Sequence, residues 1–212
     1  MSMFKLAESV KNGYRLKIYQ DNEPMNPRTE WDNLGTIAYG HSKYILGEEE
    51  AQYTEQYDNW DQWFNCEILK PYSGNVFYLP VYIYDHSGVT ISTKPFHCPW
   101  DSGQIGFIYV TKEKVRKWFG VKRITAKIRD KVYQALQHEI NIYDKYLTGQ
   151  AWGYILEKAV DCKCKGSMNP CCYEYIYETI DSCWSYYGDF DLLRNELPVD
   201  KKTINKLLDD VA

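Results

Sequence analysis

Three short runs of β-branched and aromatic residues lie within residues 79–110, and two compact polar turns divide them. The runs cover residues 81–84, 89–93 and 105–110. Runs of this length, bounded by Gly, Pro, Asp and Ser, predict strands that are joined by tight turns. We therefore expect a β-sheet to form the centre of the fold.

An aromatic stripe precedes these strands in the sequence. Tyr53, Tyr57, Trp60 and Phe64 recur with the spacing of one helix face, which predicts a helix over residues 48–69. Three glutamates lie in its expected first turn, where the helix dipole favours anions. The aromatic stripe is more typical of core packing than of a ligand surface.

Further helices are predicted after the central strands. Apolar residues keep a helical period over residues 125–147. A shorter helix is expected to begin at Thr111 and to end at Gly120, because Thr is a good N-cap and Gly a good C-cap. The tail, residues 199–211, predicts an amphipathic helix.

Strands are also predicted at residues 14–19 and 34–39, and residues 153–157 and 173–180 predict a hairpin. We expect an α+β fold, with a mixed or antiparallel sheet flanked by helices. With 212 residues, the chain is long enough for one large domain over 1–212. A cysteine-rich insert is expected in the hairpin, at about residues 158–173.

The cysteines in this hairpin predict a structural zinc site. The start of the chain has no apolar leader and no run approaches the length of a membrane span, so we expect the bacterial cytoplasm, where thiols stay reduced. Seven cysteines, an odd number, then indicate free thiols or a metal site rather than a disulfide framework. Four thiolates can complete a tetrahedral zinc site. Cys183 or a histidine could replace one member of the predicted ligand set, which is Cys162, Cys164, Cys171 and Cys172.

Charge is distributed unevenly along the chain, although the net charge is only −4. Residues 48–67 contain seven acids and no Lys or Arg, whereas residues 112–131 contain nine bases and two acids. Either segment could be a solvated helix face. An acidic surface could instead meet a basic partner, and the predicted partner-binding residues are Glu48, Glu49, Glu50, Glu55, Asp58 and Asp61.

The basic segment, residues 112–131, suggests a second kind of partner. Aromatic residues interleaved with Lys and Arg could contact nucleic acid directly. The acidic total of the chain counts against this interpretation.

The two polar turns contain residue types that occur in catalytic sites. Asp85, His86, His97 and Cys98 could belong to a thiol- or metal-dependent hydrolase, in which a histidine activates the thiol. Adjacent residues on an extended chain point apart, however, so His97 is poorly placed to activate Cys98. Polar turns whose side chains bond to backbone amides are the commoner explanation.

Five segments of the chain are distinctive: residues 31–35 (WDNLG), 79–93 (LPVYIYDHSGVTIST), 95–110 (PFHCPWDSGQIGFIYV), 143–149 (YDKYLTG) and 181–188 (DSCWSYYG). Together they resemble a largely uncharacterised family of small proteins carried by phages and mobile elements of Gram-positive bacteria. Small accessory proteins of such elements often disarm host defences. The chain therefore also resembles a candidate type II-A anti-CRISPR protein.

The leading hypothesis from the sequence is a non-enzymatic inhibitor of a bacterial defence system. It would bind a type II CRISPR effector nuclease and block the loading of target DNA. The acidic segment and the excess of aromatic residues, with 20 Tyr and 7 Trp, favour a protein-binding surface. The hydrolase and direct nucleic-acid binding are the alternatives.

Overall fold

The computed structural model describes residues 4–51, 57–161, 175–189 and 193–210. The chain, interpreted from its sequence as a single domain, divides into two compact units. Unit 1 combines residues 1–25 with residues 149–212, and unit 2 is the continuous segment 26–148. The α+β class is confirmed, but the expected single sheet is two sheets, one in each unit.

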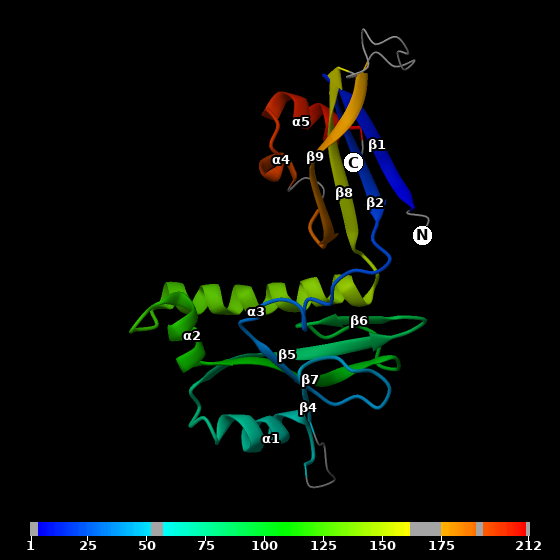
Figure 1. Ribbon diagram of the computed structural model, residues 1–212. Coiled ribbons are helices and arrows are strands. Elements are labelled where there is room, and N and C mark those ends of the chain that lie inside the picture. The colour runs from blue at the N-terminus through cyan, green and yellow to red at the C-terminus, as the bar shows by residue number, and fades with distance from the viewer. Residues whose placement is uncertain (1–3, 52–56, 162–174, 190–192, 211–212) are drawn as a thin grey trace. The chain divides into compact units, whose positions relative to one another are not determined.

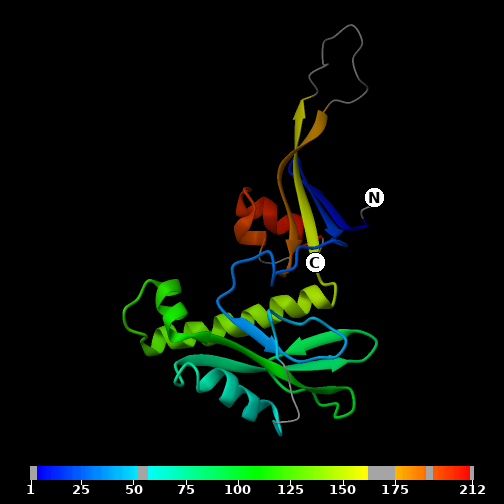
Figure 2. The ribbon, with the colours of Figure 1, turned by 60° about the horizontal axis from the view of Figure 1, so that its bottom comes forward.

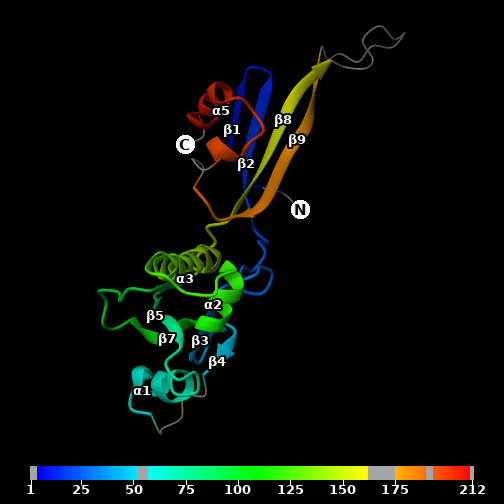
Figure 3. The same ribbon diagram turned by 90° about the vertical axis from the view of Figure 1, so that its left-hand side faces the viewer.

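Unit 1 is an antiparallel sheet with two short helices on one face (Figures 1 and 3). Leu16 and Ile18 point from the sheet into a core that the C-terminal helices complete with Leu193, Ile204 and Leu207. The sheet order is β1-β2-β8-β9. The elements are β1 (Lys5–Lys11), β2 (Tyr14–Gln20), β8 (Trp152–Asp161), β9 (Tyr175–Tyr186), α4 (Leu193–Glu196) and α5 (Lys201–Leu208).

Unit 2 has three layers, with a mixed sheet between a long helix and a short helical segment (Figures 1 and 2). The sheet order is β4-β3-β7-β5-β6, and only the β3–β4 pair is parallel. The strands are β3 (Thr36–Tyr39), β4 (Glu49–Glu50), β5 (Val76–Asp85), β6 (Val89–Ser92) and β7 (Ser102–Thr111). The helices are α1 (Trp60–Phe64), the π-helical turn η1 (Asn65–Leu69), α2 (Lys112–Phe119) and α3 (Ala126–Leu147).

The central strand β7 explains why the sequence here is almost continuously apolar. Ile108 and Val110 pack in the core beneath α3, whereas Phe107 and Tyr109 pack on the opposite face against α1. Both faces of this strand are therefore buried. Gly106 has a φ of +156°, and a Cβ there would lie 2.0 Å from the carbonyl oxygen of Ala38, so the close approach of β3 requires glycine.

The helices after the sheet form where the sequence predicts them. The Thr111 side chain caps α2, and Gly120 ends it in the left-handed conformation, with φ +63°. Thr125 caps α3 in the same way by accepting a hydrogen bond from the amide of Ile128. In unit 1, α5 confirms the helix predicted in the tail.

The helix predicted over residues 48–69 is confirmed only for its second half, residues 60–69, and is wrong at its start. Glu49 and Glu50 pair with β3 as a short parallel strand, and the amide of Ala51 donates to the carbonyl of Tyr39. A helix begins only at Trp60, where the Asn59 side chain caps it. Of the aromatic stripe, Trp60 and Phe64 lie on this helix, Tyr57 precedes it, and Tyr53 lies outside the described residues.

The four cysteines predicted to bind zinc lie outside the described residues, as does the tip of the hairpin that carries them. Within the described ranges, no cluster of three His, Cys, Asp or Glu side chains is placed to hold a metal ion. The hairpin itself is present, because β8 and β9 pair antiparallel. No helix in the described parts of the chain is both long and apolar enough to span a membrane.

Candidate anion-binding site

A pocket of about 440 Å³ lies in unit 2, where the start of β5, helix α2 and the start of α3 meet. Figure 1 shows α2 beside the N-terminal end of α3, and Figure 2 shows the same arrangement from another side. Pockets that bind small molecules are typically of this size. Its lining consists of Phe77, Lys112, Arg116, Lys122, Arg123, Ile124, Thr125, Ala126 and Arg129.

The turn between the two helices brings these cations together. Helix α2 contributes Lys112 and Arg116, which are one turn apart and therefore share a face. Gly120 reverses the chain, so that Lys122 and Arg123 reach the same pocket from the connecting segment. Arg129 adds a fifth cation from the first turns of α3.

The pocket is strongly positive, because its lining contains five cations and no carboxylate. Across the residues that the structure describes, none of the five forms an ion pair within 4.0 Å. The Lys112 ammonium donates to the Asn75 side chain at 3.1 Å, which leaves its charge uncompensated. Uncompensated cations on three neighbouring segments attract an anionic ligand.

The beginning of α3 adds to this field. Helix α3 is 22 residues long and has no acid in its first turn, so the positive end of its dipole is not offset locally. Thr125 and Ala126 place that end in the pocket wall. Helix N-termini bind phosphate because their amides point outward and the dipole favours negative charge.

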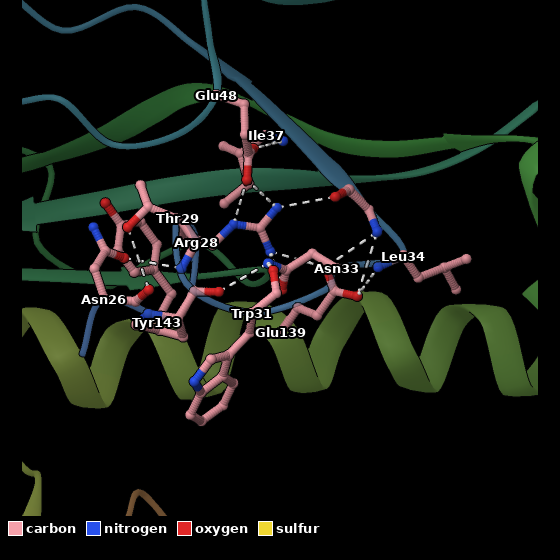
Figure 4. A network of polar contacts seen from close by, with 12 residues as sticks. Asn26, Arg28, Thr29, Trp31, Asn33, Leu34, Ile37, Glu48, Glu139 and Tyr143 are labelled. Carbon is pink, nitrogen blue, oxygen red and sulfur yellow. Dashed lines mark hydrogen bonds and ion pairs between the residues drawn. The ribbon is translucent and has the colours of Figure 1, made fainter. Parts of the chain in front are cut away.

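A second arginine site in unit 2 is arranged in the opposite way (Figure 4). The Arg28 side chain is only 3% exposed and pairs with Glu48 at 2.5 Å and with Glu139 at 2.8 Å. Its remaining donors reach the Asn33 side chain at 3.1 Å and the Gly35 carbonyl at 2.9 Å. This guanidinium is saturated by its own protein, which makes it a structural anchor.

The carboxylates of this network also bind backbone. Glu139 accepts hydrogen bonds from the amide of Leu34 at 2.8 Å, and Glu48 accepts from the amide of Ile37 at 2.6 Å. The network therefore holds the segment before β3 against α3. Sequence reasoning missed it, because Arg28 lies in a proline-containing polar loop that is typical of exposed residues.

The acids that the sequence assigned to partner binding have different roles. Glu48 belongs to the Arg28 network, and Glu49 accepts a hydrogen bond from the Tyr109 hydroxyl at 2.9 Å. Burial, together with this bond to a carboxylate, raises the pKa of Tyr109 well above its usual value. Glu55 lies outside the described residues. The remaining three, Glu50, Asp58 and Asp61, are exposed.

The polar turns place Asp101 between a histidine and a cysteine. The His86 Nδ1 lies 3.1 Å from Asp101 Oδ2, and the Cys98 thiol donates to the same oxygen at 3.7 Å. A nucleophilic thiol needs the imidazole beside it, whereas here a carboxylate separates them. Asp85 accepts from the Tyr44 hydroxyl, and His97 is exposed.

The cationic pocket is thus open to a ligand, whereas the side chains of the Arg28 network and of the polar turns bond to other groups of the protein. The pocket lining contains no His, Asp, Glu or Cys, and the Thr125 hydroxyl accepts a hydrogen bond from the Ile128 amide of its own helix. Clustered Lys and Arg side chains can bind an anion. No protein-family model, no curated protein and no solved structure matches this chain.

Proposed function

We propose that this protein binds nucleic acid, and that unit 2 holds the phosphate backbone in its basic pocket. The observation that carries the proposal is the convergence on one concave site of five cations that form no ion pair with the described residues, with no carboxylate in the pocket lining. Lys and Arg are the residues that proteins use to neutralise backbone phosphates. The chain's net charge of −4 does not oppose this, because the pocket concentrates positive charge locally.

The basic segment predicted from the sequence contains bases both inside and outside the pocket. Lys117 and Lys131 lie on the same two helices as Arg116 and Arg129, but they do not line the pocket. The two pairs therefore provide a matched comparison in which the change in net charge is the same. The pairs differ in the position of the removed charge and in the side chain removed, arginine in one and lysine in the other.

The test is the double variant Arg116→Gln/Arg129→Gln against the control Lys117→Gln/Lys131→Gln. We expect the pocket variant to lose about ten- to a hundredfold in affinity for a labelled oligonucleotide, because two phosphate contacts are removed. Its affinity should also depend less steeply on salt concentration, since fewer counterions are released on binding. Fluorescence anisotropy at several salt concentrations measures both quantities.

The control variant should retain most of its affinity. An equal loss in both variants would mean that diffuse charge, and not the pocket, attracts the nucleic acid. Wild-type protein that shows no salt-sensitive binding would refute the proposal itself.

Inhibition of a host defence nuclease is a second candidate, and it comes from the family resemblance. The exposed carboxylates Glu50, Asp58 and Asp61 favour it, since they are free to meet a basic protein surface. Binding to such a nuclease should weaken when these three are reversed to Lys. Unchanged binding would exclude this acidic surface as the interface.

A further inference from the structure

An aromatic ring lies beside the basic pocket. Phe77 lines the pocket and is buried, and the ring of Tyr133 packs edge-on against it with 5.8 Å between ring centroids. Tyr133 is 37% exposed. It follows Arg129 by four residues on α3, so the two side chains lie on the same helix face, one turn apart.

Packing against Phe77 does not account for all of the Tyr133 side chain. In the described parts of the chain, its hydroxyl makes no hydrogen bond to protein, and more than a third of the residue faces solvent. Beside this T-shaped contact, the exposed part of the Tyr133 ring is open to a ligand. A solvent-facing ring beside phosphate-binding cations is the combination that proteins use to bind single strands.

We propose that the pocket takes single-stranded nucleic acid, with a phosphate among the cations and a neighbouring base stacked on Tyr133. This inference rests on the proposed function and adds a second subsite to it. A base offers a free face only when it is unstacked and unpaired. The site therefore prefers a single strand to a duplex of the same length.

Two substitutions separate stacking from packing. Tyr133→Leu keeps an apolar contact with Phe77 but removes the ring, whereas Tyr133→Phe keeps the ring and removes only the hydroxyl. Neither Tyr133 nor Trp118 is itself a lining residue, but Tyr133 packs against the lining residue Phe77. Trp118→Leu is the control, because Trp118 is an exposed aromatic residue on α2 with no ring contact to Phe77 in the described parts of the chain. Thermal melts of all three variants check that each one is folded.

The experiment measures binding of a labelled oligothymidine and of a duplex of the same length. We expect Tyr133→Leu to weaken single-strand binding about five- to tenfold, at the lower end of what one base–aromatic stack contributes. Duplex binding should change little. Tyr133→Phe and Trp118→Leu should bind the single strand like the wild type.

Several outcomes would overturn the inference. Tyr133→Leu could leave single-strand binding intact, could weaken both ligands equally, or could be matched by Tyr133→Phe. Thymidine monophosphate that competes as strongly as the oligothymidine would assign the site to a free nucleotide. If the Arg116→Gln/Arg129→Gln variant still loses affinity in these cases, the proposed function stands and only the stacking subsite fails.

Discussion

Arg28 and the arginines of the pocket belong to the same unit but experience opposite surroundings. Arg28 is buried and has two carboxylates, an amide oxygen and a backbone carbonyl as partners. Arg116, Arg123 and Arg129 are exposed and pair with no acid that the structure describes. A saturated charge stabilises the fold, whereas an uncompensated group of charges is available to a ligand.

The largest effect on stability should follow removal of the buried cation. Arg28→Met is expected to lower the free energy of unfolding by about 3 kcal/mol, because Glu48 and Glu139 would keep their charges without the cation. Urea unfolding measures the change as a lower midpoint. Arg123→Met is the matched control, and an equal loss in both variants would remove the distinction between the two regions.

An ion pair in unit 1 is intermediate between the buried Arg28 network and the exposed arginines of the pocket. Arg15 Nε lies 2.5 Å from Glu157 Oε2, and Lys17 donates to the same carboxylate. Burial raises the pKa of Glu157, but the hydrogen bonds from Arg15 and Lys17 outweigh it and leave the pKa below its usual value. Glu157→Gln should therefore cost about 1–2 kcal/mol at neutral pH.

The sign of the pH dependence follows from the lowered pKa. The contribution of Glu157 is complete above the pKa of the unfolded state and is lost as the pH falls through the pKa of the folded state. The difference in the free energy of unfolding between wild type and Glu157→Gln should thus shrink below about pH 4. Denaturant unfolding at a series of pH values measures it. Glu178→Gln is the control, because Glu178 is exposed. A Glu157→Gln difference in unfolding free energy that stays constant with pH would contradict the role of the Glu157 carboxylate.

The smallest effect on stability is expected in the pocket. Arg116→Gln/Arg129→Gln should change the free energy of unfolding by less than about 0.5 kcal/mol, and in the stabilising direction, because like charges are removed from one site. The gain should disappear at high salt, since screening already weakens the repulsion. A clear destabilisation would mean that these arginines have structural partners.

The parts of the fold that depend on local pattern could be predicted from the sequence. Helix α3 has its apolar residues at strict helical spacing, and Thr111, Gly120 and Thr125 mark helix ends by their own chemistry. The helix expected over residues 48–69 failed at its start because the pairing of Glu49 and Glu50 with β3 is a tertiary contact. Asn59, a favourable N-cap, was the signal for the later start.

The candidate site was predicted only as a basic segment. Its sequence does not distinguish Arg116, which lines the pocket, from Lys117, which does not, until the turn at Gly120 and the position of β5 are known. Phe77 comes from a distant strand, so no local pattern connects it to these bases. The Arg28 network was missed for the same reason, since its partners lie far apart in the sequence.

The chain order of the two units has a consequence for synthesis. Strand β2 leaves the ribosome early, but its neighbour β8 and the covering helix α5 are encoded after the whole of unit 2. At about 5–20 residues per second, β2 waits on the order of ten seconds for β8. During that time Leu16 and Ile18 lack their partners, while unit 2 has all of its sequence available first. Strand β1 carries Lys5, Glu8 and Lys11, and charged residues of this kind are the ones that limit aggregation of a strand exposed during folding.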